Sequence, residues 1–164
     1  MNNVLGKSPD DERLAIRVDT REQTPLVFSD KYVKTSVGTV AVFDYCLEGD
    51  SEFAIERKSL PDFVQSVVLS KSWIRELAKI AKAREWDLPV IYVLEFCFED
   101  IADYDFSVFK SGNVKSQFVY RRVATLIFEY NVHLVFAGNR KFATYAICLL
   151  LKRRHEMLRL GNKL

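Results

Sequence analysis

The sequence predicts a single α/β domain with a mixed central sheet and helices packed on its faces. Three observations support this fold class. The 164 residues suit one domain with a core large enough to fold alone. Strand-like runs gather in the first half around a turn-rich tetrad, and short apolar runs alternate with helical patterns in the second half. The expected order is β-β-β-α-α-β-α-β-α, within a domain covering residues 14–160.

The first half predicts a first strand followed by a hairpin. Residues 1–13 are largely polar and form an expected flexible leader. Leu14–Asp19 reads as the first strand, and the mixed stretch 21–36, which contains Pro25, as a loop. Residues 37–46 and 53–58 then form an expected hairpin around Glu48-Gly49-Asp50-Ser51.

The second half changes to a helical period. Ser59 and Asp62 have the spacing of a helix N-cap, and an apolar stripe follows at helical spacing: Trp73, Ile74, Leu77, Ala78, Ile80 and Ala81. The remaining elements expected are a strand at 90–96, a helix at 114–130 capped from Ser111–Asn113, a strand at 132–137 and a terminal helix from Gly138-Asn139 to Arg159.

Bulk composition sets limits on function. The net charge of +2 does not by itself indicate a polyanion partner, and the basic clusters Lys79, Lys82, Arg84 and 152–155 read as solvated helix faces. Three scattered cysteines, in apolar surroundings and outside any CxxC pair, predict reduced core residues of an intracellular protein and no zinc site. No apolar run approaches membrane-spanning length.

The most informative chemistry lies in the expected hairpin. Glu56 and Lys58 share one face of their strand because strand side chains alternate. With a turn centred near Asp50, Asp44 lies roughly opposite Glu56. Two carboxylates facing each other are destabilising, more so when buried. A Mg²⁺ or Mn²⁺ ion relieves that cost, so these residues predict a metal-dependent phosphodiesterase site. The alternative is a surface hairpin whose charges point into water.

Neighbouring charged residues admit plainer interpretations. Asp19 ends the first strand, where an acid often serves a turn, and Glu95 invites the same reading. Arg57 points away from Glu56, so an ion pair with Asp19 or Glu22 competes with DNA contact. Asp62 is more simply explained as the capping acid of a helix than as a catalytic residue. His133 and His155 show no partner spacing.

Taken together, these residues resemble the nuclease domain of the XPF/Mus-type structure-specific endonucleases. Glu56-Arg57-Lys58 with Asp62 matches the family's Glu-Arg-Lys-x-x-x-Asp element, and Asp44-Tyr45 fits the Asp-Tyr before it. Residues 18–22, Val-Asp-Thr-Arg-Glu, look like the Val-Asp-x-Arg-Glu that opens the domain. Leu94-Glu95-Phe96 is similar to a later Ile-Glu-Phe. The resemblance spans residues 14–156.

The sequence also departs from the family pattern. Phe43 stands where the signature has Gly, and could narrow the approach to Asp44. Ser70-Lys71 replaces a common Gly-Arg, which keeps positive charge but loses the bidentate fork. The sequence ends without the tandem helix-hairpin-helix module of family members. We therefore expect a stand-alone nuclease domain, and its preference for branched or flapped DNA is not determined by the sequence.

The resemblance implies a restriction-endonuclease-like fold of the PD-(D/E)xK superfamily and a Mg²⁺ or Mn²⁺ cofactor. It implies metal ligation by Asp44, Glu56 and the Arg57 carbonyl, with Lys58 activating water and stabilising phosphoryl charge. Asp19 and Asp62 would support the site, and Arg21, Arg57 and Lys71 would place DNA. Relatives pair through this domain, which makes the apolar final helix a candidate homodimer surface.

The expected function is metal-dependent endonucleolytic cleavage of branched, flapped or single-strand-containing DNA in repair or recombination. Two alternatives remain open. One is a DNA-binding or scaffolding module that has lost activity, consistent with Phe43 and the missing helix-hairpin-helix module. The other is an exonuclease or junction resolvase using the same residues.

Overall fold

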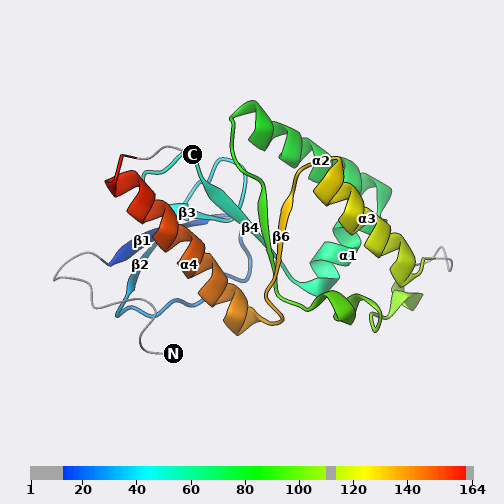
Figure 1. Ribbon diagram of the computed structural model, residues 1–164. Helices are drawn as coiled ribbons and strands as arrows, with labels where there is room; N and C mark the ends of the chain where they lie inside the picture. The colour runs from blue at the N-terminus through cyan, green and yellow to red at the C-terminus, as the bar shows by residue number, and fades with distance from the viewer. Residues whose placement is uncertain (1–12, 110–113, 162–164) are drawn as a thin grey trace.

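The computed structural model describes residues 13–109 and 114–161 and confirms an α/β fold with a mixed sheet (Figure 1). Six strands lie in the order β2-β1-β3-β4-β5-β6. Their bounds are β1 Leu14–Asp19, β2 Val33–Gly38, β3 Tyr45–Leu47, β4 Ala54–Lys58, β5 Ile91–Leu94 and β6 His133–Phe136. The expected leader, Met1 to Glu12, and the expected cap at Ser111–Asn113 lie outside the described residues.

Helices cover both faces of the sheet. Figure 1 shows α4 across one face and the group α1, α2 and α3 on the other. The helices are α1 Leu60–Val68, α2 Ser70–Glu85, α3 Ser116–Phe128 and α4 Arg140–Arg159, with short 3-10 helices η1 Phe98–Ile101 and η2 Phe106–Val108. In the described part of the chain, no helix combines the length and apolarity needed to cross a membrane.

The strand directions explain how the hairpin is placed at the centre. β3 pairs antiparallel with β1 and with β4, whereas β4, β5 and β6 run parallel. Tyr45 faces Ile55 and Cys46 faces Ala54, the register expected for a turn near Asp50. The turn is tight: the Asp50 amide donates to the Leu47 carbonyl at 3.1 Å, and Gly49 has φ of 82°, which favours glycine.

Two expected boundaries in the first half are wrong. The stretch 21–36 was expected to be a loop, but it contains most of β2, an edge strand parallel to β1. Only Val33 of β2 is buried, so the strand shows little apolar alternation and depends on backbone pairing. The strand expected at 37–46 is divided: its first two residues end β2, residues 39–44 form a loop, and its last two begin β3. Val40, Val42 and Phe43 of this loop are buried, and their apolar run produced a strand-like pattern.

The helix starts follow from their capping residues. The Ser59 hydroxyl accepts from the Asp62 amide at 3.3 Å and donates to the Asp62 carboxylate at 2.6 Å. The Asn139 side chain accepts from the Phe142 amide at 3.0 Å and begins α4. The expected helix at 114–130 is confirmed as α3, although its N-cap residue is Lys115.

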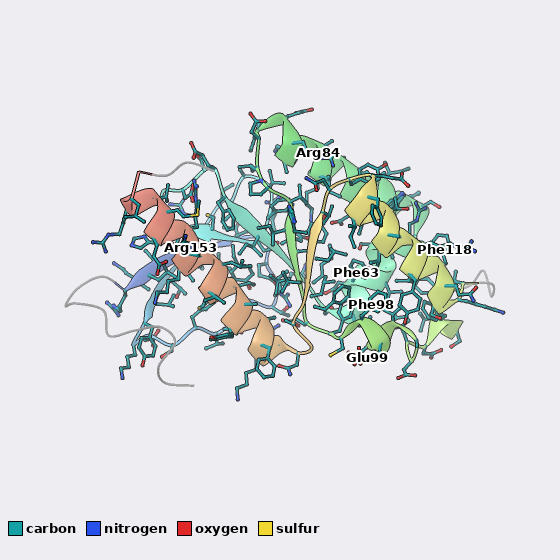
Figure 2. All side chains as sticks on the ribbon, in the orientation of Figure 1. Phe63, Arg84, Phe98, Glu99, Phe118 and Arg153 are labelled. Carbon is teal, nitrogen blue, oxygen red and sulfur yellow. The ribbon has the colours of Figure 1, made fainter. Side chains whose placement is uncertain are left out.

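Side-chain alternation divides the core between the two faces of the sheet. Ile16, Tyr45, Ile55 and Val93 pack beneath α4 with Ile147 and Leu151. On the other face, Tyr92 and Leu94 pack with the side chains of α1, α2 and α3, among them Phe63, labelled in Figure 2. Glu56 and Lys58 therefore face α1 and α2, and Arg57 faces α4.

A buried arginine ties α4 to the β3–β4 turn. Arg154 is 2% exposed, and its guanidinium binds both carboxylate oxygens of Asp50, at 2.8 and 3.2 Å, and Glu52 at 3.0 Å. The prediction that residues 152–155 form a solvated basic cluster is thus wrong for Arg154. A bidentate arginine is the one basic side chain whose geometry suits this burial.

Replacing Arg154 with Met is expected to lower the free energy of unfolding by about 2–4 kcal/mol, because the Asp50 carboxylate stays buried without its partner. Arg153→Met is the matched control. Its side chain is 68% exposed on α4 (Figure 2), and its ion-pair partner in the described part of the chain is Glu156 of the same helix, so we expect less than about 0.5 kcal/mol. Urea unfolding measures both, and equal effects would contradict the assignment.

Candidate active site

The charged end of β4 lies inside the protein. All five residues of β4 are buried, and Glu56 is only 3% exposed. The alternative of a surface hairpin with charges in water is therefore wrong. A buried carboxylate is tolerated only with a compensating partner, so its surroundings decide what it can do.

Two ammonium groups hold one oxygen of Glu56. Lys79 Nζ lies 2.7 Å and Lys58 Nζ 3.0 Å from Glu56 Oε1. Burial opposes the charge of Glu56, but these two cations keep its pKa below the usual value. The second oxygen, Oε2, is buried and has no hydrogen-bond partner among the described residues. One lone-pair-bearing atom is thus left free beside a fully formed ion pair.

Lys58 is fixed by a second carboxylate. Glu76 on α2 lies 3.2 Å from Lys58 Nζ and accepts a short hydrogen bond from the Tyr92 hydroxyl. Burial alone would favour the neutral amine, but Glu56 and Glu76 raise the pKa of Lys58 above its usual value. Lys58 is therefore a charged, rigidly held group, and not a general base in the metal-free protein.

Sequence reasoning missed both contributions of α2. Glu76 was not considered, and Lys79 was taken as part of a solvated basic face. The available signal was the spacing of Glu76, which lies three residues after Trp73 and four before Ile80, two predicted apolar positions that are both buried. A carboxylate at a core position indicates a buried cation opposite, which in this structure is Lys58.

Asp44 completes the cluster from the loop before β3. Its Oδ2 accepts from the Arg57 amide at 2.8 Å, which places the carboxylate at the end of the hairpin next to Glu56. Burial and the charge of Glu56 raise the pKa of Asp44 to about 8. The strand register places Asp44 opposite Glu56, as expected. Two ionised carboxylates at this distance would repel each other, and the raised pKa of Asp44 reflects its burial and that repulsion.

Asp19 supports the loop that carries Asp44. Its carboxylate accepts from the Val40 amide at 2.7 Å, from the Arg21 amide at 2.8 Å and from the Arg21 guanidinium at 2.6 and 3.1 Å. Burial opposes its charge, but these hydrogen bonds hold the pKa of Asp19 below its usual value. The Asp19 amide also donates to the Asp44 carbonyl at 2.8 Å. Asp19 is thus a positioning residue, and its carboxylate oxygens already accept hydrogen bonds from Val40 and Arg21.

Arg57 lies on the opposite face of β4 from Glu56. Its guanidinium donates to Glu22 at 2.9 and 3.1 Å and lies 2.9 Å from Glu95, which also binds Arg140 at 3.0 Å. The predicted pair with Glu22 is confirmed. The Arg57 side chain joins β1, β4, β5 and α4 and does not enter the carboxylate cluster, although its amide holds Asp44.

The remaining predicted site residues lie at the margins. Asp62 is the exposed capping acid of α1, Lys71 is exposed in the first turn of α2, and Arg21 extends from Asp19 into solvent. Phe43 is fully buried with its ring edge-on to Tyr92, so it occupies the core beneath the site and not its surface. The three cysteines are unpaired, with Cys97 only half-buried.

The donor set fits a hard divalent cation. Asp44 and Glu56 offer carboxylate oxygens, and Glu56 Oε2 is without a hydrogen-bond partner among the described residues. When Asp44 is ionised, three carboxylates, counting Glu76, face two ammonium groups, so the lysines compensate the negative charge incompletely. Among the described residues no group of three or more His, Cys, Asp or Glu is arranged as a complete metal cage. Mg²⁺ commonly takes one or two carboxylates and completes its shell with water and phosphate, so two suffice.

Comparison with known proteins identifies the family of the chain. A family model described as the ERCC4 domain matches residues 18–150. No curated protein matches the chain. XPF from Aeropyrum pernix has a similar structure, with a TM-score of 0.65 and 20% identity over 88% of this chain and 67% of that one. XPF from Aeropyrum pernix in complex with DNA gives 0.63 and 18%, over 88% and 66%.

These matches confirm the predicted restriction-endonuclease-like fold, and the family model covers the strand end, the loop and the helix that build the carboxylate cluster. The chain belongs to the ERCC4 domain family, with the fold of an XPF-type nuclease domain.

Proposed function

We propose that this protein is a metal-dependent DNA endonuclease that hydrolyses phosphodiester bonds in branched, flapped or single-strand-containing DNA. The observation that carries the proposal is the incompletely compensated pair Asp44 and Glu56 beside the fixed ammonium of Lys58. Membership of the ERCC4 family and the DNA complex of the Aeropyrum pernix relative support DNA as the substrate.

Asp44, Glu56 and the Arg57 carbonyl would hold Mg²⁺ or Mn²⁺. The ion would supply Lewis-acid polarisation of a phosphoryl oxygen and a more acidic bound water. Charge balance agrees with this assignment. With Asp44 ionised, three carboxylates and two ammonium groups leave one negative charge in excess, and a divalent ion makes the site singly positive. A phosphodiester carries one negative charge and would neutralise it.

The chain's own residues have distinct tasks in this proposal. Lys58, held between Glu56 and Glu76, donates to the developing charge on the phosphoryl oxygens and orients the attacking water. Asp19 keeps the 39–44 loop in place, and Asp62 sets the start of α1. Arg21 and Lys71, both exposed cations, contact the DNA backbone at the edge of the site.

A non-catalytic DNA-binding scaffold is the second candidate. It is favoured by the lack of a third metal-ligating side chain grouped with Asp44 and Glu56 in the described ranges. Calorimetry with Mn²⁺ separates the two, because a scaffold needs no cation. Exonuclease or junction-resolving activity uses the same residues, and a panel of flap, fork, splayed-arm and junction substrates distinguishes these from endonucleolytic cleavage.

Homodimerisation through α4 is a further part of the proposal. Four apolar side chains of α4 and its C-cap are substantially exposed: Phe142, Leu149, Leu158 and Leu160. Exposed apolar area of this kind favours association. Light scattering at micromolar concentration is expected to give twice the chain mass. A monomeric mass would count against a dimer without affecting the cleavage chemistry.

The proposed chemistry predicts that Asp44→Asn, Glu56→Gln and Lys58→Ala each reduce cleavage of a labelled flap substrate with Mn²⁺ by roughly 10²–10⁴-fold. Each change removes a ligand or the charged donor. Glu156→Gln is the control, since this residue is 45% exposed on α4, across the sheet from Asp44 and Glu56, and we expect activity within about threefold of wild type. Cleavage undiminished in Asp44→Asn and Lys58→Ala would refute the mechanism.

Metal binding is expected to release a proton below pH 8. Asp44 has a pKa of about 8 in the metal-free protein, so at lower pH its proton must leave before the carboxylate can bind a cation. Mn²⁺ affinity should rise by up to about tenfold per pH unit as pH approaches 8 and then level off. Calorimetry in two buffers with different ionisation enthalpies measures the released proton. Glu156→Gln should release the same proton as wild type, and affinity independent of pH between 6 and 8 would contradict this role for Asp44.

A further inference from the structure

Lys79 occupies an unusual place in the site. It comes from α2, a helix outside the strand motif, yet its Nζ makes the shorter of the two contacts to Glu56 Oε1, at 2.7 Å against 3.0 Å for Lys58. An ammonium in contact with the carboxylate expected to bind a cation has the same charge sign as that cation. The two cannot both compensate Glu56 fully, so they compete for the same negative charge.

The two lysines differ in how firmly they are held. The Lys58 side chain is 10% exposed, contacts Glu76 as well as Glu56, and lies over the Tyr92 ring at 5.8 Å. The Lys79 side chain is 31% exposed, and Glu56 is its one ion-pair partner in the described structure. Lys79 can therefore turn toward solvent by rotating its own side chain, whereas Lys58 cannot move without breaking a buried network.

We propose that Lys79 is an exchangeable counter-cation of the active site, an inference that rests on the proposed metal-dependent function. In the metal-free protein Lys79 neutralises Glu56. A divalent cation that binds Asp44 and Glu56 displaces the ammonium, which then contacts a substrate phosphate at the mouth of the site. Metal and DNA binding are thus coupled through one side chain, because the cation frees the group that the phosphate needs.

The burial pattern supports displacement over a permanent ion pair. A permanent pair is best served by an enclosed side chain that contacts more than one carboxylate, as the 1% exposed Arg154 side chain contacts Asp50 and Glu52. Lys79 instead has one strong contact on the inner side and solvent on the outer side. Glu56 also keeps Oε2 without a partner, so the lysines leave room for another cation at the same carboxylate.

The test compares Mn²⁺ affinity by calorimetry, without DNA, in wild type, Lys79→Gln, Lys79→Arg and Lys82→Gln. Lys79→Gln removes the competitor and is expected to bind Mn²⁺ at least about fivefold more tightly. Lys79→Arg keeps the charge and should stay within about twofold of wild type. Lys82→Gln is the matched control, because Lys82 is three residues along α2, contacts the Ala41 carbonyl and the Trp86 ring, and should also stay within about twofold.

A second arm measures coupling. The affinity for a flap duplex is determined with and without Ca²⁺, which replaces the catalytic ion so that DNA is not cut. The gain in affinity on adding Ca²⁺ is expected to be at least about threefold larger in wild type than in Lys79→Gln. A purely structural role for Lys79 would lower the melting temperature of the metal-free protein without changing Mn²⁺ affinity or the Ca²⁺-dependent gain.

The outcomes separate this inference from the proposed function. Tighter Mn²⁺ binding by Lys79→Gln alone supports the exchange, even if no DNA substrate is cut. Equal Mn²⁺ affinity in wild type and Lys79→Gln overturns the exchange and leaves the metal site standing. Mn²⁺ binding by neither protein overturns both proposals together. An equal Ca²⁺-dependent gain in DNA affinity overturns the contact between Lys79 and phosphate.

Discussion

The burial of three consecutive charged residues in one central strand is the constraint on which the rest of the structure depends. Glu56, Arg57 and Lys58 are all enclosed, and strand alternation sends them to two faces. Each face must then supply opposite charge from elements far away in the sequence. Glu22 and Glu95 meet the arginine, and α2 supplies both a carboxylate and an ammonium to the other face. Loops, strand ends and helices are positioned to deliver these groups.

The two faces of β4 differ in how completely their buried charges are compensated. On the α4 side the guanidinium of Arg57 has a carboxylate on either side, and Arg140 shares one of them, so charge is closely balanced. On the α2 side Asp44 holds a proton up to about pH 8 and one oxygen of Glu56 lacks a partner. The balanced charge on the α4 side supports a structural role there, and the imbalance on the α2 side is the basis of the proposed cation site. Arg57 thus joins separate elements of the fold, whereas Glu56 and Lys58 belong to the proposed site.

Much of this arrangement could be predicted from the sequence. The helices, the central strands and the 44–56 opposition follow from periodicity, capping and turn residues, which are local properties. Strand β2 and the loop at 39–44 could not be identified, because an exposed edge strand lacks apolar alternation and a buried loop imitates it. The roles of Glu76 and Lys79 in the site could not be predicted for a different reason. Their role depends on which face of α2 meets β4, and no local pattern records the partner of a helix.

The ion pair between Arg154 and Asp50 has a consequence at the opposite end of the hairpin. In a β-ladder a slip of one residue turns every side chain over, so a shifted β4 would present Arg57 to Asp44 and send Glu56 beneath α4. β3 has only three residues and two ladder partners on β4 to resist such a slip. Because Arg154 binds the β3–β4 turn to α4, it favours the observed register of β3 and β4 over shifted registers. The alignment of Asp44 with Glu56 thus depends on Arg154, a residue in the last third of the chain that contacts neither carboxylate.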